Sequence, residues 1–184
     1  MGRTAKRGRR SAKDKKVVKT RPNKLTALKE IEKRWNEIHK TFSELGEVAD
    51  RISKAIAITD TDTTSAGRVT LQSSIIMDVL KSCVADSKQV VEKANQIIIF
   101  LIDLFVKKYG KVKITNLLPE AREFYDKINR IIDLLKVQSE IETLIKTRNI
   151  DRTKLDIIRE KWSDIRELST YFQTADCYLD TFRF

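Results

Sequence analysis

Residues that interrupt helices are scarce in this chain of 184 residues, which holds two prolines and five glycines. Folds built from strands and tight turns use both residue types often, so their scarcity argues against a turn-rich β fold. Hydrophobic residues make up 41% of the chain and charged residues 34%, a mixture that can bury a core and that is typical of long helices. We therefore predict an all-α protein.

Histidine and cysteine are nearly absent as well. His39 is the one histidine, so no histidine-based metal cluster can form within one chain, and we expect this side chain on the surface. Cys83 and Cys177 lie far apart and fit no metal-ligand spacing, so we expect buried free thiols, with no bound metal and no cofactor. The glycines are too scattered for a phosphate-binding loop. The sequence predicts no enzyme activity.

One polar run matches a catalytic pattern. Asp60 and Asp62 fit the Asp-x-Asp-x-Thr motif of haloacid-dehalogenase-type phosphatases, in which the first Asp is the nucleophile and the second a general acid. That chemistry requires a buried parallel strand before the motif, whereas a helical heptad precedes it here. A calcium loop opening at Asp60 also fails, because Ser65 and Leu71 stand where Gly and Glu are needed. We interpret residues 59–67 as a loop that caps and joins helices.

Positive charge is concentrated in one segment. Residues 1–24 hold eleven cations against the single anion Asp14, a net charge of +10, whereas residues 25–184 hold 26 cations against 25 anions, a net charge of +1. The first segment has no aromatic residue and few large apolar ones, so we expect it to be disordered alone and able to become helical on a phosphate surface. We predict a basic nucleic-acid-binding arm, residues 1–24, followed by a helical body, residues 25–184. The cations expected to contact phosphate are Arg3, Lys6, Arg7, Arg9, Arg10, Lys13, Lys15, Lys16, Lys19, Arg21 and Lys24.

Such an arm gives affinity that is sensitive to salt and insensitive to sequence, because cations that replace counterions on phosphate release them into solution. Double-stranded DNA is the favoured partner and RNA the alternative. Three other uses of the arm stay open, namely a nuclear-import signal around residues 6–10, burial in ribosomal RNA, and contact with anionic lipid. The segment lacks the apolar stretch of a secretory signal, so we do not expect export by that route.

Apolar residues at helical spacing predict four long helices in the body. The first covers residues 28–56 in a heptad, the second residues 69–109 with Gly110 as its stop and a local break near Ser87, the third opens at Pro119 and is interrupted at residues 147–151, and the fourth runs from about 151 almost to the C-terminus. Trp35 and Trp162 occupy similar segments, and both should point inward. Short links between long helices predict an antiparallel bundle, with a spectrin-type three-helix repeat as the alternative.

Two segments carry more apolar side chains than contact with one neighbouring helix requires. Residues 97–106 are apolar except for Asp103, but at about 15 Å they are half as long as a membrane span. Their side chains fall on several faces of the helix, and residues 171–184 add five aromatics. Contacts with a second copy or a related helical subunit would explain both surpluses, as would an ordinary intramolecular core. The candidate interface residues are Ile99, Ile102, Phe105, Val106, Tyr171, Tyr178, Phe182 and Phe184.

The order of these parts, together with the opening run MGRTAKRGRR, resembles the α-helical major capsid proteins of filamentous archaeal viruses. The resemblance implies that residues 1–24 wrap a double-stranded DNA genome, that the helical body builds the particle, and that the aromatic C-terminus lies at subunit contacts within a virion or nucleoprotein particle. Two other classes share the layout. One is a ribosomal or ribonucleoprotein assembly factor, and the other is a cytoplasmic or nuclear protein-interaction module with an import tail.

Overall fold

The computed structural model describes residues 26–58, 69–148 and 150–183. Every regular element in these ranges is a helix, which confirms the all-α prediction for this part of the chain. The elements are α1 (Thr26–Lys33), α2 (Trp35–Ile58), α3 (Val69–Tyr109), the 3₁₀ turn η1 (Ile114–Asn116), α4 (Pro119–Leu135), α5 (Val137–Thr147), α6 (Arg152–Phe172) and α7 (Ala175–Phe182).

The first expected helix is two helices joined at Arg34. The amide of Arg34 donates to the carbonyl of Ile31 at 3.1 Å, and the amide of Ile38 donates to the carbonyl of Arg34 at 2.9 Å, so the chain turns within one residue and resumes its helical hydrogen bonds. Beyond the turn, the heptad residues of α2 face inward as expected and are fully or almost fully buried: Ile38, Phe42, Leu45, Ala49, Ile52 and Ile56. The loop assigned to residues 59–67, with its Asp60 motif, lies outside the described residues.

Helix α3 has the bounds that the sequence predicts. Ser87, where a break was expected, is buried inside a continuous helix, because its hydroxyl donates to the carbonyl of Cys83 at 2.7 Å and needs no other partner. At the C-terminal end, the amide of Gly110 donates to the carbonyl of Val106 at 2.8 Å. A Cβ atom at position 110 would lie 2.4 Å from that same carbonyl oxygen. Only glycine fits this turn.

The third and fourth expected helices are also divided. Pro119 opens α4 as predicted, but a turn at Lys136 separates α4 from α5. Helix α6 begins after Asp151, whose side chain caps it by accepting a hydrogen bond from the amide of Thr153 at 2.9 Å. A second turn at residues 173–174 then separates α6 from α7.

Continuous helical spacing to the C-terminus predicts that Ala175 and Leu179 face inward, and the turn at residues 173–174 makes this prediction wrong. Ala175 is exposed and Leu179 is half-buried, because the two residues outside the helix shift the phase of the pattern. Cys177, Tyr178 and Phe182 face the core instead. An antiparallel bundle of four long helices is therefore not confirmed, since three of the four expected helices are each divided in two.

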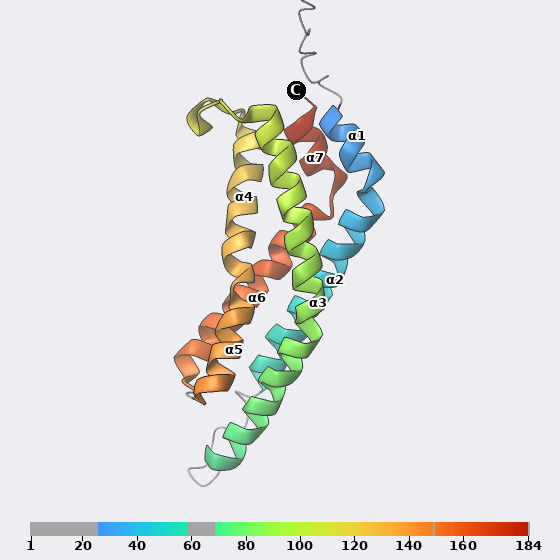
Figure 1. Ribbon diagram of the computed structural model, residues 1–184. Coiled ribbons are helices and arrows are strands. Elements are labelled where there is room, and N and C mark those ends of the chain that lie inside the picture. Colours follow the sequence, from blue (N-terminus) through green and yellow to red (C-terminus); the bar gives the residue numbers. More distant parts are fainter. Residues whose placement is uncertain (1–25, 59–68, 149, 184) are drawn as a thin grey trace, which may run out of the picture.

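The long helices run side by side along an elongated body (Figure 1). Helix α2 packs most extensively on α6 and then on α3, α3 also packs on α5, and α4 packs on α6 and α7. Helix α7 in addition touches α1. One end of the body, which we call the α1 end, gathers the start of α1, the end of α3, η1, the start of α4 and α7 (Figure 1).

A cluster of aromatic rings holds the α1 end together around Phe124 of α4, whose side chain is fully buried. Its ring centroid lies 6.1 Å from that of Phe105 on α3 and 5.8 Å from that of Phe172 on α6. It also lies 5.9 Å from the ring of Tyr178 and 5.4 Å from that of Phe182, both on α7. Such ring pairs add to the free energy gained by burying apolar surface.

We expect the Phe124→Ala substitution to lower the free energy of unfolding by about 3–5 kcal/mol, because it opens a cavity where four helices meet. Urea denaturation of the wild-type and variant chains measures the difference. Ile99→Ala is the control, since Ile99 is 60% exposed and its truncation should change stability by less than about 0.5 kcal/mol. A loss below about 1 kcal/mol for Phe124→Ala would show that the cluster does not hold the helices together.

Candidate functional surfaces

The predicted nucleic-acid-binding cations all lie outside the described residues. They occupy residues 1–24, and the described chain begins at Thr26, the first residue of α1. The assignment of these eleven cations to phosphate contacts therefore stays a prediction. Phe184, the last of the candidate interface residues, also lies outside the described part of the chain.

The other candidate interface residues separate into core and surface. Phe105, Tyr178 and Phe182 are buried within a single chain, so placing them at a subunit surface was wrong. They are buried because α3 has neighbours on more than one side and because α7 folds back over α1 and α4. The hydroxyl of Tyr178 donates to the carbonyl of Phe172 at 2.8 Å, which satisfies its polar atom inside the core.

The remaining candidates are accessible to different degrees. Ile99 is 60% exposed and Val106 is 56% exposed, so both present apolar surface to solvent. Ile102 and Tyr171 are half-buried, and the ammonium group of Lys127 lies 4.0 Å from the centroid of the Tyr171 ring. Ile99, Ile102 and Val106 are spaced three and four residues apart, so they form one apolar line along α3. We call them the α3 line.

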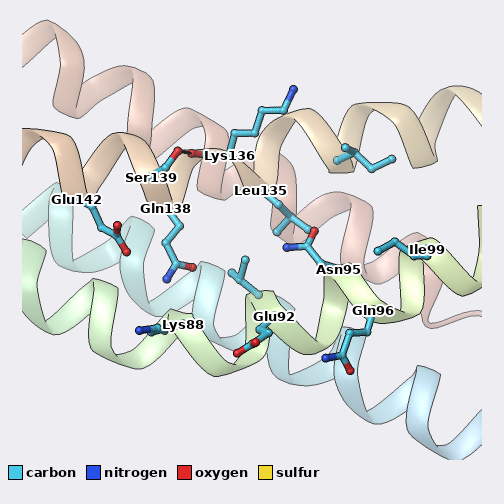
Figure 2. A pocket seen from close by; sticks show the side chains of 12 residues that line it. Lys88, Glu92, Asn95, Gln96, Ile99, Leu135, Lys136, Gln138, Ser139 and Glu142 are labelled. Carbon is cyan, nitrogen blue, oxygen red and sulfur yellow. Dashed lines mark hydrogen bonds between the residues drawn. The ribbon is translucent and has the colours of Figure 1, made fainter.

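A groove that sequence reasoning missed lies between α3 and the adjoining ends of α4 and α5, with a volume of about 710 Å³. Figure 2 shows side chains of α3 and α5 facing one another across it, with Ile99 at one end. The α3 line therefore continues into this groove. The lining residues are Lys88, Val91, Glu92, Asn95, Gln96, Ile99, Ile132, Leu135, Lys136, Gln138, Ser139 and Glu142.

One side chain in the groove has a polar atom without a hydrogen-bond partner in the described part of the chain. Gln138 is 9% exposed, and its Oε1 atom accepts no hydrogen bond from any residue that the structure describes. Its neighbour Ser139 is satisfied, because its hydroxyl donates to the carbonyl of Lys136 at 2.7 Å (Figure 2). A buried amide oxygen favours a donor. No local sequence pattern marks this groove, because its walls come together only through the packing of α3 against α5.

The two tryptophans, which were both expected to point inward, differ in their surroundings. Trp162 is fully buried, and its indole N–H has no partner among the described residues. Trp35 is half-buried and lies beside Tyr178, with ring centroids 5.8 Å apart. It lines a groove of about 480 Å³ between α1 and α7, whose other apolar walls are Leu28, Ile31 and Leu179.

The polar residues singled out from the sequence take the positions expected of them. His39 is exposed, with its ring 5.8 Å from that of Trp35. Cys83 and Cys177 are free and buried. Burial raises the pKa of the Cys83 thiol to about 11, helped by the nearby Asp86 carboxylate, and burial raises the pKa of the Cys177 thiol to about 12.

Two kinds of feature are absent from the described ranges. No group of three or more His, Cys, Asp or Glu side chains there could hold a metal ion. None of the helices there combines the length and the apolar character that crossing a membrane requires.

Comparison with protein-family models, with curated proteins and with solved structures finds no match to this chain.

The raised thiol pKa values predict how stability depends on pH. Unfolded thiols ionise near their ordinary pKa of about 8.5, whereas the buried thiols hold their protons, so the unfolded state releases protons first as pH rises. The free energy of unfolding should therefore be unaffected by the thiols below about pH 8 and should fall between that pH and 11–12. At pH 10.5 we expect each thiol to lower the free energy of unfolding by up to about 2–3 kcal/mol, at about 1.4 kcal/mol per pH unit above 8.5.

Urea denaturation at pH 8 and at pH 10.5 tests this dependence. The Cys83→Ala variant should lose less stability over the interval than the wild-type chain does. Val91→Ala serves as the control, because Val91 is buried on the same helix and carries no titratable group. If Cys83→Ala and the wild-type chain lose equal stability, burial of this thiol does not shift its titration.

Proposed function

We propose that this protein is a non-catalytic, structural nucleic-acid-binding protein. Residues 1–24 neutralise the phosphates of a nucleic acid, with double-stranded DNA favoured, while the helical body self-associates into a capsid-like or other nucleoprotein particle. The observation that carries the proposal is the division of charge, which assigns +10 to the first 24 residues and +1 to the other 160. The same layout underlies the resemblance to the major capsid proteins of filamentous archaeal viruses.

A long polyanion is the partner that such a segment fits best. Duplex DNA carries one negative charge about every 1.7 Å of its axis, and each cation that replaces a counterion adds to the affinity. The segment offers no aromatic side chain on which a base could stack. Recognition by this segment should therefore depend on phosphate and salt and should vary little with base sequence.

The body has features that favour packing of one copy against another. Its near-neutral charge lets copies approach without strong mutual repulsion. The α3 line exposes Ile99 and Val106, and it leads into the groove where the Gln138 amide oxygen lacks a donor. Contiguous apolar surface beside a polar rim is typical of protein interfaces. We propose that a second copy covers this surface.

Removing the cationic segment should abolish most of the binding. In a fluorescence titration with duplex DNA across a salt series, we expect the full chain to show a steep fall of log K with log salt. Deletion of residues 1–24 should flatten this slope by up to about 10, since each of the eleven cations contributes at most about 0.9. The control is a chain whose first 24 residues are shuffled at constant composition, which should bind like the original.

Two results would contradict the proposal. Binding that does not change with salt would exclude phosphate neutralisation. Binding that survives the deletion, or that is lost on shuffling, would show that the net charge of residues 1–24 does not make the contact. The same titration with duplex RNA shows whether DNA is preferred.

Charging the α3 line should prevent self-association. We expect the double variant Ile99→Lys, Val106→Lys to remain smaller than the wild-type chain in light-scattering measurements, both alone and on duplex DNA, because a lysine desolvated at the contact costs free energy. The matched control is Ile157→Lys on α6, where the native side chain is 45% exposed and lies away from α3. If the wild-type chain stays monomeric on DNA, as a ribonucleoprotein assembly factor would, the assembly half of the proposal is wrong.

A further inference from the structure

The last turn of α3 and the loop between α3 and α4 carry unneutralised positive charge on the surface. Residues 107–113 contain four lysines and no acidic residue, and Lys107, Lys111 and Lys113 are exposed. Some cations elsewhere in the body have acidic partners, such as Lys54 with Asp50 at 2.6 Å. The three loop lysines form no ion pair with any residue in the described ranges. We call Lys107, Lys111 and Lys113 the loop lysines.

The loop holds these lysines on a fixed backbone. The amide of Val112 donates to the carbonyl of Tyr109 at 2.7 Å, and Gly110 makes the close turn described above. The Arg122 guanidinium on α4 donates to the carbonyl of Thr115 at 2.9 Å. Leu117 is buried and anchors the second half of the loop. Fixed cations lose less conformational entropy on binding than cations on an unstructured segment do.

The end of α3 is tied to α7, and α7 packs on α1. The ammonium group of Lys108 donates to the carbonyl of Thr181 at 3.1 Å. The hydroxyl of Tyr109 donates to the same carbonyl. Since α7 touches α1, and since α1 follows directly on residues 1–25, the loop lysines lie at the end of the body from which the cationic segment leaves (Figure 1).

We propose that the loop lysines form a second phosphate-binding surface, which contacts the same nucleic acid as residues 1–24. This inference rests on the proposed function. The three loop lysines and the eleven cations of residues 1–24 can contact one strand or one duplex together. Because the two sets are linked in one chain, binding by one set raises the effective concentration of the other at the polymer. Because the loop is fixed on the body, its contacts would set how the helical body is oriented on the polymer.

An anionic membrane is the other surface that lysines with nearby aliphatic residues could contact, because Val112, Ile114 and Leu118 are exposed in the same loop. Nucleic acid is favoured by two observations. The cationic segment leaves from the same end of the body, and the aromatic residue of the loop, Tyr109, is directed inward. Its ring packs on that of Phe105 at 4.8 Å, whereas membrane-binding surfaces insert aromatic side chains.

The test uses the full chain with Lys107→Gln, Lys111→Gln and Lys113→Gln combined. The matched control removes the same charge at the opposite end of the body with Lys146→Gln, Arg148→Gln and Lys154→Gln, which are exposed residues around the turn between α5 and α6. A third chain replaces the loop lysines with arginines. Circular dichroism and urea midpoints establish that all three variants fold.

In titrations with duplex DNA, we expect the loop glutamine variant to lower the salt slope by about 2–3 and the affinity at 0.1 M salt by at least about tenfold. The opposite-end variant should change the slope by less than about 1, and the arginine variant should bind like the wild-type chain. Equal effects of the two glutamine variants would overturn the inference while leaving the proposed function intact. Absence of any salt-sensitive binding by the full chain would overturn the proposed function itself.

Vesicles of mixed neutral and anionic lipid provide the remaining comparison. If the glutamine variant loses vesicle binding in a flotation assay but keeps the DNA affinity of the wild-type chain, the loop is a membrane contact and the inference is wrong. If DNA affinity falls and vesicle binding is weak for every chain, the assignment to nucleic acid stands.

Discussion

The packing of aromatic rings around Phe124 is the constraint on which the rest of the described structure depends. Helix α4 reaches α3, α6 and α7 through this one side chain. Burying a ring among four others gains free energy only when all their helices are in place, because a missing partner leaves a cavity. The short helix α7 could not be stable alone at eight residues. It is held by the rings of Tyr178 and Phe182, which insert beside Phe124.

The position of α7 determines what the α1 end can present to a partner. By folding back, α7 offers the carbonyl of Thr181 to Lys108 and Tyr109, which fixes the end of α3. The loop that follows therefore starts from a fixed point, at the same end of the body as the first described helix (Figure 1). The same arrangement buries the C-terminal aromatic residues, which would otherwise have formed an exposed apolar surface. The α3 line leaves exposed apolar side chains along the side of the body.

Sequence patterns predicted the helices well where the signal was strong and missed their divisions. The bounds of α3 follow from its long apolar pattern and from Gly110, and the inward face of α2 follows from the heptad. The turns at Lys136 and Gln173 carry no proline or glycine, and these two residues stay in the right-handed helical region, with φ of −65° and −80°, while Thr174 after Gln173 is extended. Nothing local in the sequence marks such turns, because tertiary packing and not residue preference produces them. The shifted phase of the apolar pattern in α7 buries Tyr178 and Phe182, which had been assigned to an interface. The groove at Gln138 could not be predicted, because it depends on how α3 and α5 meet.

The charge pattern of the body also decides how binding measurements can be interpreted. Its ion pairs are mostly between residues three or four apart on one helix, such as Lys33 with Glu30, and a few join helices, such as Arg130 with Asp164 and Lys161 with Glu140. Most of these side chains are partly exposed, so each pair adds little stability, and salt that screens them should leave the aromatic and aliphatic core intact. A fall in affinity with salt then reports the release of counterions from phosphate and not the unfolding of the body. For this reason the salt slope, compared between the loop variant and its matched control, can assign contacts to the loop lysines as a group.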